Sequence, residues 1–341
     1  MTAKIPVTVL GATGTVGQKF VRLLDEHPWF EIASVAASEQ SAGRLYGDVV
    51  RWREPTPIPS RVAAMTVQRA APGIPGRIAF SAIEAEIAGE VEQAFARAGA
   101  FVVTNTKTHR MDPFVPLLVP EVNPGHLDLI PQQQLERGWS GGIVANPNCS
   151  TAGLVVALAP LHNAFGIEKL FVATMQAVSG AGYPGVASLD ALGNVIPYIG
   201  GEEEKIEKET RKILDGTFSV SAHTNRVAVI DGHLEVVSVG FGRRVRPQEA
   251  IATLESFRAP DEVAALPSTP VRPVEYDPRP DRPQSRLDLD RGNGMTVTVG
   301  RVRPCNLLDL RLVLLSHNTV RGAAGAAIQN AELLVQRGMV R

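Results

Sequence analysis

The first part of the chain alternates short apolar runs with segments in which apolar residues recur at helical spacing. Val7–Leu10 is a β-branched run that ends at a glycine, a pattern typical of a buried strand. Apolar side chains then recur from Val16 to Leu24, and His27-Pro28 ends this helix because proline disfavours helical geometry in the residue before it. Glu31–Ala37 is predicted to be a second strand. Strand, helix and strand in this order predict a βαβ unit of a parallel sheet with a right-handed crossover.

Three later strands and one helix extend this pattern. The strands are predicted at Ile78–Ala82, Ala100–Thr104 and Gly142–Ala145, and the helix at Gly89–Ala98. Residues 1–148 therefore predict an α/β domain with a Rossmann-type doubly wound parallel sheet, and their number is normal for one such domain.

The pattern changes after Cys149. Ser150–Leu161 is predicted to be a helix, Lys169–Ala177 a strand, and the strongly charged Gly201–Leu214 another helix. Longer strands of a mixed or antiparallel sheet are predicted at Thr224–Ile230, Leu234–Phe241, Thr296–Arg303 and Leu308–Leu315. Residues 149–317 therefore predict a second domain, of the α+β class.

Two further segments complete this picture of the chain. Pro260–Pro283 is rich in proline and is expected to wind over the surface. Gly322–Gln336 is rich in alanine and predicts a final helix. We expect this helix, within residues 318–341, to return to the first domain.

The composition narrows the class of protein and of ligand. The 341 residues are 44% hydrophobic, which is enough for a sizeable core and two domains. Lys and Arg number 34 and Asp and Glu 35, so the net charge of −1 gives no electrostatic case for binding nucleic acid or an anionic membrane. No apolar run approaches the roughly 20 residues of a membrane span, and Met1–Pro6 has no signal-peptide pattern. We expect a cytoplasmic protein that acts on a small molecule.

A glycine-rich segment, GATGTVG at 11–17, follows the first predicted strand and opens the first helix. Gly11 and Gly14 allow a tight turn and a close approach of the backbone to a pyrophosphate. The helix that begins near Thr15 and Val16 supplies free N–H groups and the positive end of its dipole. The same spacing also fits a plain glycine turn in an ordinary βαβ unit. Its position after the first strand favours a dinucleotide cofactor.

The loop after the second predicted strand bears on the choice between NADP and NAD. NAD enzymes usually carry an acid there, which holds the ribose hydroxyls. Here Ser38, Ser41 and Arg44 could instead receive a 2′-phosphate, although Arg44 also fits a solvated loop charge. Glu39 could serve NAD if it turned inward. The residues expected at the ribose, two serines and an arginine, favour NADP over NAD.

Cys149, in NPNCST at 146–151, follows a predicted strand and precedes a helix. The helix dipole and the free N–H groups stabilise a thiolate at such a place. A thiolate attacks acyl carbons and forms a thioester that a hydride can reduce. A buried structural cysteine is the plainer alternative, but the polar turn formers around Cys149 argue against a simple core site. Cys305 lies in a turn with no helix start behind it and is interpreted as structural.

A reactive thiol also needs a base, and His233 is the candidate. It lies in a predicted turn between two strands, and Arg226 precedes it by seven residues. On one continuous strand this odd separation would put the two side chains on opposite faces, so the turn must reorient one of them. A plain turn histidine is the alternative. No His, Cys or acidic residues cluster with metal-ligand spacing, so we expect no catalytic metal.

Motifs of a recognisable kind run in order from one end of the chain to the other. They are LGATGTVGQ (10–18), NPNCST (146–151), TMQAVSGAGYPG (174–185), GGEEEKIEKET (200–210), NRVAVIDGH (225–233), DRPQ (281–284), GNGMTVTVGR (292–301) and HNTVRGAAG (317–325). As a set they resemble the aspartate-semialdehyde dehydrogenase family, in its archaeal and fungal-like branch. The resemblance implies an NADP-dependent oxidoreductase whose second domain serves catalysis and dimerisation, and a homodimer or homotetramer.

The resemblance also implies roles for single residues in catalysis and cofactor binding. Cys149 resembles the acyl-forming nucleophile and His233 the acid/base, while Asn148 and Gln176 resemble the residues that position the thioester and its oxygen. The residues that fall where the family meets NADP are Gly11, Thr13, Gly14, Val16, Ser38, Ser41, Ser179, Gly180 and Asn318.

The implied substrate contacts use the charged residues of three segments. Arg226 resembles the arginine that grips the α-carboxylate, and Glu202 the acid that takes the α-ammonium. Arg110 and Lys205 resemble the pair that binds the acyl phosphate or free phosphate. An Arg fork fits a carboxylate and Lys suits a phosphate. From pattern alone, however, Glu202 and Lys205 would belong to a solvated helix face with Glu-to-Lys pairs.

The implied reaction is the reduction of L-aspartyl-4-phosphate by NADPH through a Cys149 thioester, which serves Lys, Thr and Met synthesis. Malonyl-CoA reductase and N-acetyl-glutamyl-phosphate reductase are enzyme alternatives with related chemistry, and an NADP-binding regulator without activity is a third. Two loops depart from the family pattern. Ser81–Glu84 replaces a SALP-like turn and Thr104–Arg110 replaces SNxSxHR, which leaves open whether the acyl donor is a phosphate or a CoA thioester.

Overall fold

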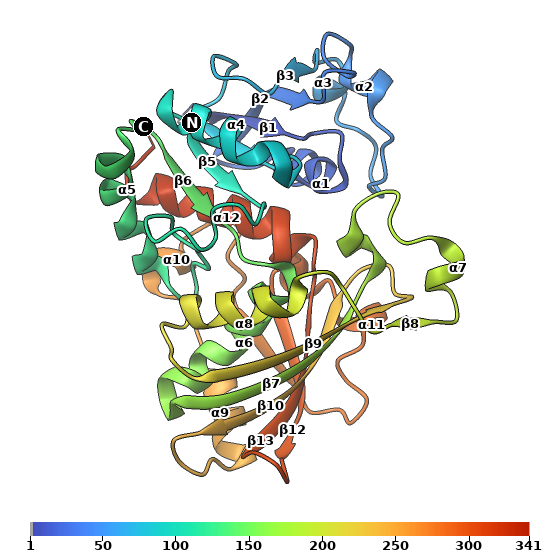
Figure 1. Ribbon diagram of the computed structural model, residues 1–341, viewed down its shortest axis with the longest axis vertical. Coiled ribbons are helices and arrows are strands. Elements are labelled where there is room, and N and C mark those ends of the chain that lie inside the picture. Colours follow the sequence, from blue (N-terminus) through green and yellow to red (C-terminus); the bar gives the residue numbers. More distant parts are fainter. Residues whose placement is uncertain (1–2, 341) are drawn as a thin grey trace. The chain divides into compact units, whose positions relative to one another are not determined.

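The computed structural model describes residues 3–340, which divide into two compact units. Unit 1 contains the chain up to Leu118, Gly125–Asn146 and the residues from Ala324 on. Unit 2 contains Val119–Pro124 and Pro147–Ala323. Figure 1 shows the helices and strands of both units. Within residues 3–340, no helix has both the length and the apolar character needed to cross a membrane.

Unit 1 is built on a parallel sheet of six strands in the order β3-β2-β1-β4-β5-β6. The order reverses between β1 and β4, the neighbours at which ligands of doubly wound sheets bind. This arrangement confirms the predicted Rossmann-type sheet. The strands are β1 (Ile5–Leu10), β2 (Phe30–Ala37), β3 (Gln68–Arg69), β4 (Ile78–Ser81), β5 (Phe101–Thr104) and β6 (Gly142–Ala145).

The helices of unit 1 include one from the far end of the sequence. That helix, α12, packs against β4 and β5, and its residues from Gly325 to Leu334 are all buried. His27 Nε2 lies 2.8 Å from the buried Glu332 carboxylate of α12. The helices of unit 1 are α1 (Thr15–Leu24), α2 (Tyr46–Val49), α3 (Ser60–Ala63), α4 (Ala85–Arg97), α5 (Ile130–Arg137) and α12 (Gly325–Gln336), with a 3₁₀ turn at Pro124–Leu129.

Unit 2 is built on a mixed sheet of seven strands in the order β11-β12-β13-β10-β7-β9-β8. The pairs β7–β9 and β11–β12 are parallel, and the other pairs are antiparallel. This confirms the predicted α+β class. The strands are β7 (Ile167–Gln176), β8 (Val195–Ile196), β9 (Ser219–Val227), β10 (His233–Phe241), β11 (Val274–Asp277), β12 (Val297–Pro304) and β13 (Leu310–Ser316).

Two long helices of unit 2 pack on its sheet. The buried helix α6 contacts β7, β10, β12 and β13, and α8 packs against β9 and α6 (Figure 1). The helices are α6 (Cys149–Phe165), α7 (Ser188–Ala191), α8 (Glu202–Ile213), α9 (Pro247–Ser256), α10 (Asp261–Ala264) and α11 (Ser285–Asp288). Shorter turns are the 3₁₀ segments Val178–Ala181 and Arg291–Gly294 and the π-helix Val320–Ala324.

The proline-rich stretch Pro260–Pro283 is more regular than we predicted. It contains α10 and the strand β11, which pairs in parallel with β12 and buries Val274 and Asp277. Proline lacks the N–H group that pairs in a sheet, but Val274–Asp277 itself contains no proline. It is an edge strand of the sheet, and prolines are tolerated next to an edge strand.

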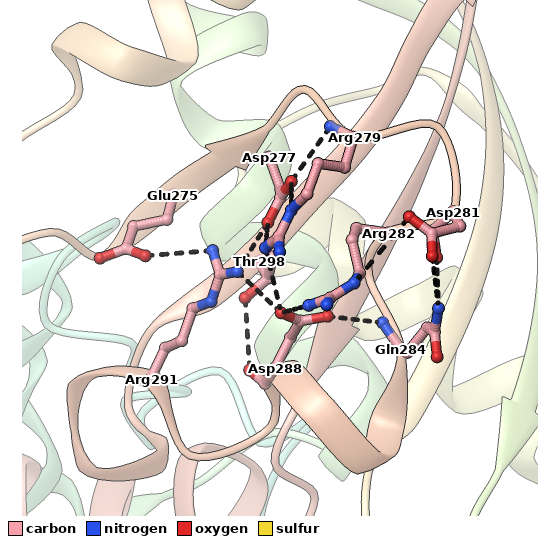
Figure 2. A network of polar contacts seen from close by, with 9 residues as sticks. All are labelled: Glu275, Asp277, Arg279, Asp281, Arg282, Gln284, Asp288, Arg291 and Thr298. Atoms are coloured by element: carbon pink, nitrogen blue, oxygen red, sulfur yellow. Dashed lines mark hydrogen bonds and ion pairs between the residues drawn. The ribbon is translucent and has the colours of Figure 1, made fainter.

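Carboxylates of this strand and of α11 form ion pairs with several arginines (Figure 2). Arg291 Nη2 lies 2.6 Å from Asp277 and 2.7 Å from Asp288, and Arg282 Nη1 lies 2.7 Å from the same Asp288 oxygen. The arginine hydrogen bonds, that of Arg279 above all, hold the pKa of Asp277 well below its usual range. This network ties the DRPQ motif, through Arg282 and the Gln284 N–H, to α11.

Candidate active site

The nucleophile turn begins α6 at Cys149. Asn148 is the N-cap: its side-chain Oδ1 accepts hydrogen bonds from the backbone N–H groups of Ser150 (3.0 Å) and Thr151 (3.3 Å). Asn is among the residues that cap helices best, because its short side chain satisfies N–H groups that the helix leaves unpaired. The thiol of Cys149 therefore lies at the positive end of a 17-residue helix, where a thiolate is stabilised.

His233 lies beside this thiol. Its Nε2 is 3.2 Å from the Cys149 sulfur, and its Nδ1 accepts a hydrogen bond of 3.1 Å from the backbone N–H of Ala177. Burial, and then the charge of Arg226, lower the pKa of His233 to about 3. The imidazole is therefore neutral near pH 7. Because Nδ1 accepts a hydrogen bond, the proton of the neutral ring resides on Nε2 and faces the sulfur.

The sheet of unit 2 brings Arg226 and Gln176 to the same place. Arg226 is the second-last residue of β9 and pairs with Gln176, the last residue of the parallel strand β7. His233 is the first residue of the antiparallel strand β10, on the other side of β7. The odd separation of 226 and 233 is thus resolved, because the two residues lie on different strands with β7 between them. All three side chains are buried, with exposed fractions of 7% or less.

The Arg226 guanidinium is held close to the pair of Cys149 and His233. Its Nη1 donates a hydrogen bond of 2.6 Å to the Ala177 carbonyl. Burial lowers the pKa of Arg226, and the charges of Cys149 and Glu202 oppose that shift. Gly180 lies against the same group: a Cβ atom there would come within 2.9 Å of Arg226 Nη1 and 3.2 Å of His233 Cε1. The glycine thus leaves the room that a side chain would fill.

Ser179 and Asn318, both expected near the cofactor, lie together in unit 2. Asn318 Nδ2 donates to Ser179 Oγ at 2.8 Å, and Asn318 Oδ1 accepts the Gly232 N–H at 2.8 Å. Asn318 therefore connects the Ser179–Gly180 segment to the turn that precedes His233.

The charged helix α8 contributes to the nucleophile turn. Asn148 Nδ2 donates to Glu202 Oε2 at 2.6 Å, and Lys205 Nζ donates to Glu202 Oε1 at 2.5 Å. Glu202 is only 8% exposed. Glu202 and Lys205 thus form a partly buried contact beside Cys149, whereas the charge pattern of the helix alone indicated a solvated face.

Glu209 is a residue of this site that the sequence reasoning missed. Its Oε2 accepts the backbone N–H of Asn148 at 2.5 Å, and its exposed fraction is 2%. A signal was present: Glu202 and Glu209 are two helical turns apart and lie on the face marked by Ile206 and Ile213, all of which are buried. The apolar stripe therefore identifies which acids of α8 turn inward.

A second missed position is Gly322, in the π-helix Val320–Ala324. A Cβ atom there would lie 2.8 Å from Cys149 Cβ and 2.9 Å from its Cα, so backbone packs directly on the nucleophile. The neighbouring Arg321 is fully buried and forms ion pairs with Glu121, at 2.6 Å for the shorter contact. A π-turn is rare and often marks a functional site.

Unit 1 carries the glycine-rich loop at the carboxyl end of β1. Gly11 has φ +75, and a Cβ atom there would lie 2.4 Å from the Ala82 carbonyl oxygen. At Gly17 a Cβ atom would lie 2.1 Å from the Gly11 carbonyl oxygen, so helix and loop pack closely. Helix α1 begins at Thr15 with no side-chain cap, and the buried Thr15 hydroxyl has no hydrogen-bond partner among the described residues. These free donors suit a pyrophosphate.

The loop after β2 contains the residues expected at the ribose. Ser38 and Arg44 are exposed and Ser41 is half-buried. Backbone hydrogen bonds from Ser41 and Ala42 to the Ser38 carbonyl form a turn. Glu39 does not turn inward: its side chain is 84% exposed and lies 3.9 Å from the Arg69 guanidinium.

Arg110, expected at the phosphate, belongs to unit 1, whereas Lys205 belongs to unit 2. Arg110 is buried, and its Nη2 donates to the Asn105 carbonyl at 2.8 Å. Glu92 of α4 supports this loop by accepting hydrogen bonds of 2.6 Å from the Ser81 and Thr104 hydroxyls. Burial raises the pKa of Glu92 and lowers that of His109, which lies 3.4 Å from it.

The side chains that the structure brings together in unit 2 are Asn148, Cys149, Gln176, Ser179, Glu202, Lys205, Arg226, His233 and Asn318. Within residues 3–340, no group of three or more His, Cys, Asp or Glu side chains could hold a metal ion. The remaining predicted residues lie in unit 1, at the carboxyl ends of its strands.

Comparison with family models defines the class of protein. The NAD-binding domain of the semialdehyde dehydrogenases matches residues 6–130, and their dimerisation domain matches residues 158–321. The chain therefore matches both domains of the semialdehyde dehydrogenases, which agrees with the thiol and imidazole of unit 2 and the glycine-rich loop of unit 1.

Individual relatives narrow the class further. The chain is 48% identical to aspartate-semialdehyde dehydrogenase of Archaeoglobus fulgidus (98% of this chain, 99% of the relative) and 45% identical to that of Cryptococcus neoformans (99% of each). It is similar to the crystal structure of aspartate-semialdehyde dehydrogenase with NADP from Candida albicans, with a TM-score of 0.90 and 41% identity over 99% of this chain and 100% of that one. The chain belongs to the aspartate-semialdehyde dehydrogenase family.

Proposed function

We propose that this protein reduces L-aspartyl-4-phosphate to L-aspartate 4-semialdehyde with NADPH, through a thioester on Cys149. The observation that carries the proposal is the 3.2 Å contact between the Cys149 sulfur and His233 Nε2 at the start of α6. This pairing of a thiol with an imidazole at a helix N-terminus is what acyl transfer requires. The names of the relatives at 48% and 45% identity supply the substrate.

The residues of unit 2 account for the acyl-transfer steps. The Cys149 thiolate attacks the acyl carbon, the carbon–oxygen bond to phosphate breaks and inorganic phosphate leaves with a proton from solvent. NADPH, when bound, supplies the hydride that reduces the thioester carbon. The Nε2–H of His233 donates a hydrogen bond to the sulfur and to the carbonyl oxygen of the substrate, which becomes negatively charged during attack and reduction. When the reduced species, a thiohemiacetal, collapses, the carbon–sulfur bond breaks and the thiolate returns to the positive end of α6.

The neutral state of His233 specifies its part in this chemistry. A ring with a pKa of about 3 holds one proton at pH 7, and the Ala177 N–H keeps that proton on Nε2. Of the acid/base role that the sequence indicated, His233 therefore takes the part of the hydrogen-bond donor. Gln176 and Asn148 position the thioester and its oxygen in this proposal.

The substrate contacts are proposed for four charged groups. Arg226 holds the α-carboxylate with the part of its guanidinium that does not contact Ala177. Glu202, buried beside Asn148, holds the α-ammonium. Arg110 and Lys205 bind the phosphoryl group. A buried carboxylate at this place favours an amino-acid substrate over malonyl-CoA, which has no ammonium group.

The residues present fit NADP. The α1 N-terminus has no side-chain cap, and the Thr15 hydroxyl is buried without a partner, as a pyrophosphate site requires. Glu39 faces Arg69, so it does not oppose a 2′-phosphate. The groups that we propose to hold the cofactor are Gly11, Thr13, Gly14, Thr15, Val16, Ser38, Ser41 and Arg44 of unit 1, and Ser179, Gly180 and Asn318 of unit 2.

We further propose a cytoplasmic homodimer or homotetramer that forms through unit 2. The match of residues 158–321 to a dimerisation domain supports association through this unit. The measurement is the molar mass of the purified protein by light scattering, and a monomer at micromolar concentration would contradict the proposal.

The function itself is tested with purified protein, L-aspartate 4-semialdehyde, NADP and inorganic phosphate. We expect NADPH to appear at a rate that saturates in phosphate, since phosphate must cleave the thioester in this direction. Turnover without phosphate dependence, together with NADPH oxidation by malonyl-CoA, would assign the protein to the CoA-dependent relatives. Cofactor binding with no turnover of either substrate would make it a regulator.

A further inference from the structure

Lys205 and Glu202 form an unusual pair for two groups that are expected to bind different parts of one substrate. Lys205 Nζ lies 2.5 Å from Glu202 Oε1, and the two side chains are only 25% and 11% exposed. The other oxygen of Glu202 accepts the Asn148 amide at 2.6 Å. Both carboxylate oxygens are therefore engaged, one by a neutral amide and one by a primary ammonium.

The two contacts of Glu202 differ in how readily they can change. Asn148 is fixed, because its Oδ1 caps α6 and its backbone N–H donates to Glu209. Lys205 is attached by a flexible four-carbon chain, and its ammonium has no fixed orientation. A change of partner at Glu202 therefore takes place at Oε1.

The ammonium on Oε1 is the same chemical group as the α-ammonium of an amino acid. Two ammonium groups on one carboxylate oxygen repel each other, and in a partly buried site this repulsion is less screened than in water, so the binding of one weakens the binding of the other. Lys205 thus shows that the Glu202 site accepts a primary ammonium, and it also occupies that site.

We propose that Lys205 is a displaceable partner of Glu202: the α-ammonium of the substrate replaces it on Oε1, and the released Lys205 binds the phosphoryl group. The proposal rests on the proposed function, because it takes the substrate to be an amino acid that carries an acyl phosphate. It makes the two ends of the substrate dependent on each other. An amino group increases the affinity for phosphate, and phosphate increases the affinity for the amino group by the same factor.

This exchange also explains selection for an amino acid. A substrate without the α-amino group loses its own contact with Glu202 and, in addition, leaves Lys205 bound to Glu202. The loss of the amino group therefore weakens the binding of both the ammonium end and the phosphoryl end of the substrate. The selectivity for an amino acid is greater than the loss of a single ion pair would give.

The test is phosphate binding to the full-length Cys149→Ala variant, which binds ligands without turnover. Calorimetric titration with inorganic phosphate is done with NADP alone, with L-aspartate 4-semialdehyde, and with succinate semialdehyde, which lacks the amino group. We expect the amino compound to lower the phosphate Kd by at least about fivefold, the lower end of typical couplings. Succinate semialdehyde is expected to leave the Kd unchanged.

A second variant removes the acceptor of Lys205. Glu202→Gln, added to Cys149→Ala, keeps an oxygen for the Asn148 amide but no longer attracts Lys205. We expect its phosphate Kd without aldehyde to fall towards the value that the parent variant reaches with the amino compound, and the coupling to vanish. Glu204→Gln is the matched control, because Glu204 is an exposed acid in the same first turn of α8. It should retain the coupling.

The outcomes separate this proposal from the function on which it rests. If the wild-type protein reduces NADP with aspartate semialdehyde and phosphate, but the amino and desamino compounds affect phosphate binding equally, the exchange is wrong and the function stands. Weaker phosphate binding in the Glu202→Gln variant would also refute the exchange. If the wild-type protein shows no such reaction, both proposals fail.

Discussion

The carboxyl group of Glu235 offers a test of how this protein responds to pH. Glu235 lies in β10 with no exposed surface, and neither of its carboxyl oxygens has a hydrogen-bond partner among the described residues. Burial raises the pKa of Glu235 well above the ordinary value of 4.5. The folded protein therefore keeps this group protonated under conditions in which the unfolded chain ionises it.

The sign and size of the effect follow from proton linkage. For a carboxyl group whose pKa is raised by folding, stability is fully present below the unfolded pKa and is lost as pH rises through the folded pKa. Between these values each pH unit costs about 1.4 kcal/mol for one proton. The protein should therefore lose stability as the pH rises above the unfolded pKa, until the pH reaches the raised pKa of Glu235 in the folded protein.

The perturbation is Glu235→Gln, which removes the titration and keeps the shape. Any fixed cost of burying the amide is the same at every pH, so the informative quantity is the change with pH of the difference in stability between variant and wild type. We expect chemical denaturation at a series of pH values from 5.5 upward to show the free energy of unfolding of the variant rising relative to that of the wild type, by up to about 1.4 kcal/mol per pH unit. The exposed Glu255→Gln is the control and should show no such trend. A difference that stays constant with pH for Glu235→Gln would show that the buried carboxyl group is not kept neutral by the fold.

The other predictions concern the active site. Cys149→Ala should abolish turnover in the NADP reduction assay while NADP binding, followed by fluorescence, persists; retained turnover would exclude the thioester. Arg226→Lys should lower kcat/KM by about 100-fold, because a single ammonium cannot replace the fork that positions the substrate; near-normal kinetics with a lowered Tm would make Arg226 structural. Glu209→Ala should cost about 1–3 kcal/mol of stability by leaving the Asn148 N–H buried and unpaired, and Glu209→Gln, which retains an acceptor oxygen, should recover most of this loss in denaturation experiments; equal losses would mean that charge rather than the hydrogen bond matters. Arg44→Ala should raise the Kd of NADP more than that of NAD, whereas equal effects would place Arg44 away from the 2′-phosphate.

The sequence predicted well those features that depend on local pattern. Five strands of the parallel sheet and the start of α6 at Cys149 follow from short apolar runs and turn residues, and the structure reproduces them within a few residues. The sixth strand, β3 (Gln68–Arg69), is short and polar and was not predicted. The predicted ends of a strand were wrong where the pairing with a neighbouring strand decides them. We predicted a strand over Thr224–Ile230, but β9 spans Ser219–Val227, because its partner β7 pairs with it from Lys169 onward.

The features that escaped prediction depend on contacts between distant segments. The proton position on His233 is set by the N–H of Ala177, which lies 56 residues away in the sequence and carries no side-chain signal. Glu209 reaches the Asn148 backbone across 61 residues. Gly322 is required by its approach to Cys149, which no local pattern of alanine and glycine reveals.

The division of the chain into units has a consequence for how the protein is made. Unit 1 contains the first strands to be synthesised, yet it also contains α12, which covers part of β4 and β5 and is itself buried. During translation, the apolar surface of these strands must wait until about 200 further residues have left the ribosome, a delay of order ten seconds or more at typical rates. We therefore expect nascent chains that end before residue 325 to bind chaperones and to be degraded readily, and unit 1 to become resistant to proteases only when α12 has docked.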